Sequence, residues 1–161
     1  MSGKWYSGPM ETEFGACPSG DERVRLFGLL YETNARLSRT LGLRLEQSVG
    51  LPLPWFDVLL QLRRAPEGRL KMNQIADATV HSSGGTTRLI DRIEAAGFVE
   101  RQNCPKDRRA IHVAITVSGN AKLNEALEAH VSHLDCHLVD RLSAEERTTL
   151  ATLLTKINGE D

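Results

Sequence analysis

The sequence has few aromatic residues, few cysteines and no long apolar run, and each shortage narrows the class of protein. Two Trp, two Tyr and four Phe in 161 residues leave a core of aliphatic side chains, which suits helix packing. The three cysteines, at positions 17, 104 and 136, form no C-x-x-C pair and no disulfide framework, which indicates a reducing compartment. Without an apolar run of about 18 residues or a secretory signal, we expect a cytoplasmic protein that does not contact the membrane.

Neither sign of charge dominates the chain, which excludes a uniformly basic nucleic-acid coat. Lys and Arg number 20 against 21 Asp and Glu, a net charge of −1. Residues 63–109 nevertheless hold ten basic and six acidic side chains, a net count of +4, so the remainder carries −5. A local basic face on an acidic body is the pattern expected of a protein that binds nucleic acid through phosphate contacts.

Catalytic signatures are also missing. The sequence contains no G-x-S-x-G, no P-loop, no G-x-G-x-x-G and no H-E-x-x-H. We therefore expect no enzymatic activity and no cofactor.

Apolar periodicity predicts a mainly helical chain. A Gly- and Pro-rich stretch over residues 1–20 predicts a flexible arm, and the 3.6-residue stripe over 21–50 predicts one long amphipathic helix. Three shorter helices follow: one begins near Pro54, one covers about 72–79, and one covers about 83–96 before Gly97.

After Gly97 the period changes to two, which predicts two strands, Phe98–Asn103 and Ala110–Thr116, joined by a turn. Thr116 can cap a long helix that runs to about Leu142, and Ser143-x-x-Glu146 is a capping box for the last helix. The predicted fold class is mainly α with a small β wing. It comprises the flexible arm 1–20, a dimerisation helix 21–50, a winged helix-turn-helix domain 51–116, and dimerisation helices 117–157.

Three motifs carry a family resemblance. The segment H-S-S-G-G-T-T-R-L-I-D-R-I-E-A-A-G-F-V-E-R at 81–101 resembles the recognition helix and first wing strand of MarR-family transcription regulators. D-R-R-A-I-H-V-A-I-T followed by V-S-G resembles that family's D-x-R wing motif and L-T-x-x-G helix entry, with Ile115 replacing Leu. P-W-F-D-V-L-L-Q-L at 54–62 is similar to its second helix. The resemblance covers about residues 22–157 and implies a homodimer that binds palindromic double-stranded DNA, usually as a ligand-responsive repressor.

The residue types in these motifs fit DNA binding. Serines before the recognition helix leave its N–H groups and positive dipole end available to phosphate, and glycine lets the backbone approach closely. Side chains of the first turns would project toward base edges in the major groove, and a wing arginine can enter a narrow minor groove. By the resemblance, Asp107 orients the wing. The predicted DNA-binding set is Ser82, Ser83, Gly85, Thr86, Thr87, Arg88, Arg92, Asp107, Arg108 and Arg109.

Alternatives stay open beside this interpretation. His133 and His137 have the i, i+4 spacing that can chelate zinc, and His130 lies on the same face, so a zinc-responsive regulator of the same fold is one alternative. A winged-helix module that binds only proteins is another. Tyr31, Trp55 and Phe56 are candidates to line an effector pocket, and core packing explains them equally well.

Overall fold

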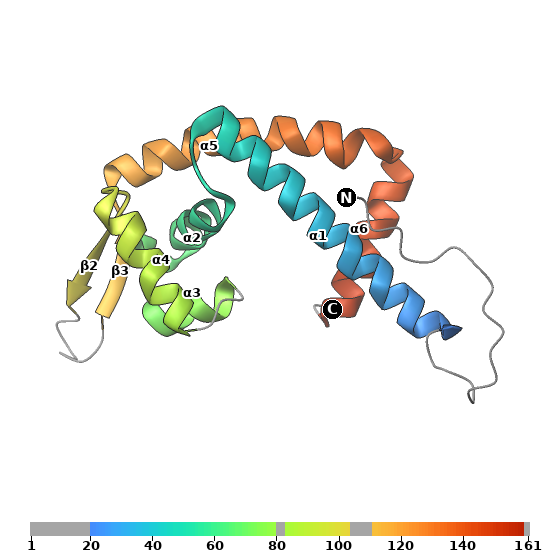
Figure 1. Cartoon of the computed structure of the whole chain (residues 1–161), viewed down its shortest axis with the longest axis horizontal. Helices are drawn as coiled ribbons and strands as arrows, with labels where there is room; N and C mark the ends of the chain where they lie inside the picture. Colours follow the sequence, from blue (N-terminus) through green and yellow to red (C-terminus); the bar gives the residue numbers. More distant parts are fainter. Residues whose placement is uncertain (1–19, 80–82, 104–110, 160–161) are drawn as a thin grey trace, which may run out of the picture. The chain divides into compact units, whose positions relative to one another are not determined.

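The computed structural model describes residues 20–79, 83–103 and 111–159. Helices dominate, as predicted, and three short strands form one small sheet (Figure 1). In chain order the elements are α1 Glu22–Val49, α2 Leu53–Arg64, η2 Pro66–Gly68, β1 Arg69–Lys71, α3 Met72–Ala78, α4 Ser83–Ala95, β2 Val99–Asn103, β3 Ile111–Ile115, α5 Val117–His137, η3 Val139–Arg141 and α6 Ala144–Asn158. None of the described helices is both long and apolar enough to span a bilayer.

Helix boundaries follow the capping signals in the sequence. The Asp21 carboxylate accepts a hydrogen bond from the backbone N–H of Arg23 at 2.8 Å and so caps α1. Gly50 and Gly97 follow α1 and α4 with φ of 67° and 78°, the left-handed conformation that glycine adopts at helix C-termini. The chain divides into two compact units at residues 36 and 37, within α1, so α2 to α6 all belong to the second unit.

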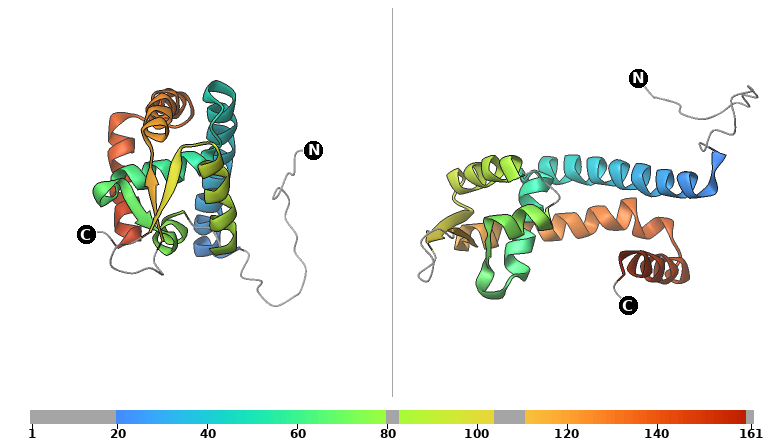
Figure 2. Two further views of the ribbon diagram at one scale, coloured as in Figure 1. Left: turned by 90° about the vertical axis from the view of Figure 1, so that its left-hand side faces the viewer. Right: turned by 90° about the horizontal axis from the view of Figure 1, so that it is seen from below.

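The wing sheet contains one strand more than the sequence predicted. β1 pairs antiparallel with β3, and β3 pairs antiparallel with β2, so the strand order is β1-β3-β2. Both views in Figure 2 show β2 and β3 side by side. The two predicted wing strands are confirmed as β2 and β3, and β1 was missed because three residues are too few to show alternation. The turn before β1 is marked by positive φ angles at Glu67 and Gly68.

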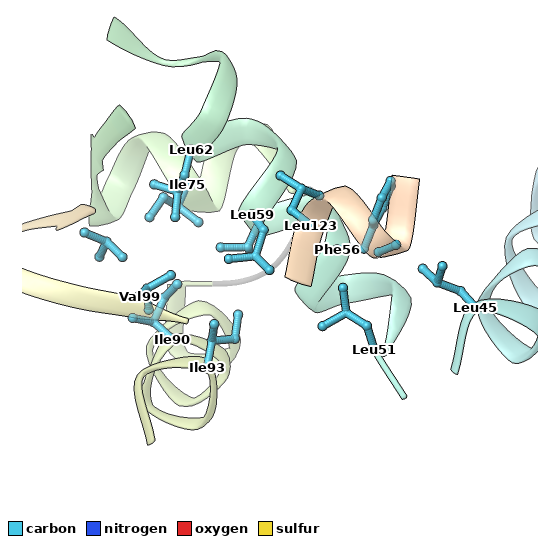
Figure 3. Packing of buried hydrophobic residues seen from close by; sticks show 13 residues of the cluster. Leu45, Leu51, Phe56, Leu59, Leu62, Ile75, Ile90, Ile93, Val99 and Leu123 are labelled. Atoms are coloured by element: carbon cyan, nitrogen blue, oxygen red, sulfur yellow. The ribbon is translucent and has the colours of Figure 1, made fainter. Parts of the chain in front are cut away.

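One aliphatic core fixes the helices of the winged domain on its sheet. Its buried members come from five helices, two strands and the link between α1 and α2, which supplies Leu51, and Figure 3 shows how they pack. They are Leu45, Leu51, Phe56, Val58, Leu59, Leu62, Ile75, Ile90, Ile93, Val99, Val113, Leu123 and Ala126. Because α2 lies at the centre of this cluster, the orientation of α4 is set by packing rather than by local helix propensity.

The long helix before α6 ends earlier than predicted. α5 stops at His137, not near Leu142, and the chain tightens into the η3 turn, where the N–H of Leu142 donates to the carbonyl of Val139 at 3.1 Å. No Gly or Pro marks this end, which is why the apolar pattern extended the prediction. The predicted capping box is confirmed: Ser143 N–H donates to Glu146 Oε2 at 2.8 Å and Glu146 N–H donates to Ser143 Oγ at 3.2 Å.

Candidate nucleic-acid interface

Helix α4 has one buried face and one exposed face. Thr86, Ile90 and Ile93 follow the i, i+4, i+7 spacing and are at most 1% exposed, so they anchor the helix on the core. The opposite face leaves Thr87, Arg88 and Arg92 exposed, together with Gly85 in the first turn. An exposed helix face with two arginines, held on a rigid core, has the geometry that a major-groove reading helix needs.

The prediction that Thr86 projects toward DNA was wrong. Its side chain is 1% exposed because it begins the stripe that Ile90 and Ile93 continue. The spacing to those two isoleucines was the signal in the sequence that places Thr86 on the inner face. Thr87 and Arg88 keep the exposure predicted for them.

Part of the predicted DNA-binding set lies outside the described residues. Ser82 precedes the first residue of α4, Ser83, and is among the undescribed positions. Asp107, Arg108 and Arg109 fall in the segment 104–110 between β2 and β3, which is also undescribed. Their assignments stay predictions from the sequence.

The structure reveals an ion-pair cluster that sequence reasoning missed. Arg101 on β2 donates through Nη2 to Asp91 Oδ1 at 2.5 Å and through Nη1 to Glu94 Oε2. The backbone N–H of Arg101 donates to Glu94 Oε1 at 2.9 Å, so the carboxylate receives both a main-chain and a side-chain hydrogen bond. The cluster therefore ties the middle of α4 to the strand that begins the wing.

Arg101 stays charged in this cluster. Desolvation by itself would lower the pKa of Arg101, but the hydrogen bonds and negative charges of Asp91 and Glu94 outweigh it, and the pKa lies above its usual value. A charged guanidinium with two carboxylate partners makes stronger, more directional bonds than a neutral donor would.

The start of α5 is locked onto the turn between α4 and β2. Thr116 Oγ1 and Ser118 Oγ each donate to the carbonyl oxygen of Gly97 at 2.7 Å, and Thr116 N–H donates to the carbonyl of Phe98 at 3.1 Å. Thr116 also accepts from the N–H of Gly119 at 2.9 Å, which confirms it as the predicted cap of this helix. Four hydrogen bonds therefore join the start of α5 to the base of the wing or cap the helix there.

The predicted effector-pocket residues are explained by aromatic packing. Phe56 is 2% exposed and belongs to the core, with its ring centroid 4.7 Å from that of His130. Trp55 meets Phe98 edge-on at 6.3 Å. Tyr31 belongs to the other unit, where it is 68% exposed and stacks on Phe27 at 6.4 Å. Of the three, Phe56 is a core residue, so an effector role for it would require the core to open.

The histidine face of α5 is partly buried. The Nδ1 atoms of His130 and His133 are buried and have no hydrogen-bond partner among the described residues. Burial, and to a smaller extent the charge of His133, lowers the pKa of His130 below its usual value. Over the described ranges of the chain, no three His, Cys, Asp or Glu side chains come together in a group that could hold a metal ion.

Comparison with known proteins gives this geometry a family context. The sequence model of the MarR family matches residues 49–110. The HTH-type transcriptional regulator PecS of Dickeya dadantii is 34% identical over 138 residues, which are 84% of this chain and 81% of PecS. Among solved structures, AbsC, a MarR family transcriptional regulator from Streptomyces coelicolor, is 28% identical with a TM-score of 0.75, over 87% of this chain and 94% of AbsC. A mutant MarR from E. coli complexed with operator DNA is 28% identical with a TM-score of 0.74, over 85% of this chain and 96% of that one.

Proposed function

Because this chain belongs to the MarR family of DNA-binding transcription regulators, we propose that it is a ligand-responsive repressor that binds a pseudo-palindromic operator as a homodimer. The observation that carries the proposal is the exposed face of α4, where Thr87, Arg88 and Arg92 lie opposite the buried stripe of the same helix. No signature of an enzyme was found in the sequence, and the relatives named above are regulators.

Each residue of this face has a separate role in the proposal. Arg88 donates bidentately to a guanine edge, Thr87 contacts a neighbouring base, and Arg92, one turn further along, contacts phosphate. In the wing, Arg109 enters the minor groove and Arg108 adds phosphate affinity, while Asp107 orients the turn. The net count of +4 over residues 63–109 supports an affinity dominated by counterion release.

Dimerisation is supported by apolar side chains that are exposed to solvent in the single chain. Helix α6 contains no buried residue, and its stripe of Leu150, Leu153, Leu154 and Ile157 is between 37% and 63% exposed. At the other end of the chain, Phe27 is 69% exposed on α1. Such stripes on two terminal helices are stable in water when a second copy covers them, and a two-fold dimer presents two recognition helices to a palindrome.

The response to a small molecule is the part of the proposal that depends most on family membership. Within the structure, Trp55 on α2 touches Phe98 at the turn between α4 and β2. A ligand that displaces α2 relative to that turn would move the recognition helix, which is the kind of differential interaction that a ligand switch requires. Trp55 is the residue of this unit through which we expect an effector to act.

The proposed function is tested by binding isotherms on an operator duplex selected from genomic fragments and on a random duplex of equal length. We expect Arg88→Ala to weaken the binding free energy by about 1–3 kcal/mol on the operator and by much less on the random duplex, because the substitution removes a base contact. Arg141→Ala, which removes an exposed arginine of η3, outside both α4 and the apolar stripe of α6, is the matched control and should bind like the wild type. A wild-type protein that binds both duplexes equally would refute sequence-specific recognition.

A further inference from the structure

The contacts of Arg101 give it a role that the predicted DNA-binding set does not include. We propose that Arg101 is a positioning residue for DNA binding, which neutralises two carboxylates on α4 and fixes that helix to strand β2. The inference deepens the proposed function and rests on it. Its basis is the cluster in which one guanidinium bonds Asp91 and Glu94, residues ten and seven positions earlier in the chain.

Asp91 occupies a position on α4 where an uncompensated charge would oppose DNA binding. With about 100° of rotation per residue, Asp91 lies within about 60° of both Thr87 and Arg88 and one turn further along the same face. Its side chain is 55% exposed. A carboxylate at this place repels the phosphates that approach α4, so the positive charge of Arg101 removes an obstacle to binding.

The same carboxylate is a competing partner for Arg88. Residues three apart on a helix are neighbours, so Asp91 is within reach of the Arg88 guanidinium. Among the ion pairs of the described residues, Asp91 pairs with Arg101 and Arg88 has no partner. By holding Asp91, Arg101 leaves Arg88 available for a base edge.

Glu94 completes the arrangement because it fixes Arg101 in place. The Glu94 carboxylate accepts from both the main chain and the side chain of Arg101, and it is 34% exposed, against 26% for Arg101. Arg101 also sits opposite Val113 in the register of β2 and β3, and Val113 is fully buried. The guanidinium therefore extends from a strand anchored in the core, and its planar fork serves two carboxylates at once, which a lysine cannot do.

Two other roles for Arg101 make different predictions. If Arg101 itself bound phosphate, removing the acids would not restore the affinity lost with the arginine, and the salt dependence would weaken by about one unit per protomer. If the ion pairs served folding alone, DNA affinity would follow thermal stability in every variant. If Arg101 acts through the carboxylates, neutralising them restores binding even though the arginine is absent.

The experiment compares the operator affinity of the full-length wild type with that of three variants at several salt concentrations. We expect Arg101→Ala to bind the operator about tenfold more weakly, because two carboxylates are left uncompensated near the duplex. The triple variant Arg101→Ala/Asp91→Asn/Glu94→Gln should return to within about threefold of the wild type and keep its salt slope. Arg101→Lys, which retains the charge but can serve only one carboxylate, should lie between the wild type and Arg101→Ala.

A matched control and a second double variant keep the result interpretable. Lys122→Ala removes a cation of similar burial, 22% exposed, from an ion pair with Glu125 that lies within α5, and should change the operator affinity less than twofold. The double variant Asp91→Asn/Glu94→Gln keeps Arg101 and replaces both carboxylates by amides, whose oxygens still accept hydrogen bonds. It should bind the operator at least as tightly as the wild type. This result does not depend on whether Arg101→Ala folds.

Two results would overturn the inference while leaving the proposed function intact. One is wild-type affinity in Arg101→Ala. The other is a triple variant that stays folded by circular dichroism but binds as weakly as Arg101→Ala. A wild-type protein without operator binding would refute the proposed function and this inference together.

Discussion

Gly119 is the residue at which one added methyl group should do most damage to the winged domain. It lies buried in the first turn of α5, directly beside the turn that joins α4 to β2. A Cβ placed on Gly119 would stand 2.0 Å from the carbonyl oxygen of Phe98 and 3.0 Å from Cγ1 of Ile115. The nearer neighbour is main chain and cannot rotate away, so either α5 or the turn must move by more than about 1 Å to restore an ordinary C···O contact of about 3.3 Å.

The cost can be worked from the contacts that this movement breaks. Overpacking of a well-packed site typically costs about 1–3 kcal/mol, and losing the hydrogen bond from Thr116 N–H to Phe98 adds about 1 kcal/mol. The better helix propensity of alanine returns about 1 kcal/mol. We therefore expect Gly119→Ala to lower the unfolding free energy by about 1–3 kcal/mol, which in a chain of this length lowers Tm by about 2–12 °C.

Thermal unfolding at one fixed protein concentration measures this effect, because the Tm of a dimer depends on concentration. Gly28→Ala is the matched control: it makes the same substitution inside α1, where a Cβ meets nothing within 4 Å, and should leave Tm unchanged or slightly raised. A Tm for Gly119→Ala within about 2 °C of the wild type would contradict the close packing of α5 on the wing.

Two further predictions concern pH and assembly. Because burial lowers the pKa of His130, the unfolded chain binds the proton more tightly, and the unfolding free energy should decrease as pH falls through the usual histidine value of 6.5. Chemical denaturation at about pH 7.5 and pH 5.5 measures this decrease in unfolding free energy, and His130→Phe should make it smaller. The same decrease in the variant as in the wild type would refute the assignment to His130. Leu153→Glu should convert a dimer of twice 17.8 kDa into monomer or aggregate in light scattering, whereas Thr152→Glu, on the other face of α6, should remain dimeric. A wild-type protein that is monomeric at micromolar concentration would refute the dimer proposal.

Local signals were enough to predict the helices and most of their ends. The cap at Thr116, the capping box at Ser143 and Glu146, and Gly97 after α4 each concern backbone groups within four residues, so the sequence displays them directly. The exposed positions of Thr87 and Arg88 were equally predictable, because the apolar stripe of α4 leaves them on the outer face.

Features that depend on distant pairing were not predictable. β1 is three residues long and forms because it pairs with the edge of β3, and no local sequence pattern predicts that pairing. The cluster of Arg101 with Asp91 and Glu94 joins a helix to a strand across the Gly97 turn, so its charges looked like ordinary surface residues. Thr86 is a different case, since its polar side chain suggested a surface role although its spacing to Ile90 and Ile93 placed it inside.

The central claim is that α4 reads a two-fold symmetric DNA site, and a hydroxyl-radical footprint on a selected operator tests it most directly. The account predicts two protected half-sites related by two-fold symmetry, with centres about one helical turn, or 10 to 10.5 base pairs, apart. In a dimethyl sulfate footprint, Arg88→Ala should lose the N7 protection of one guanine in each half-site, while the hydroxyl-radical protection of the backbone persists. A single asymmetric protected region, or protection that does not change with the DNA sequence, would contradict the account.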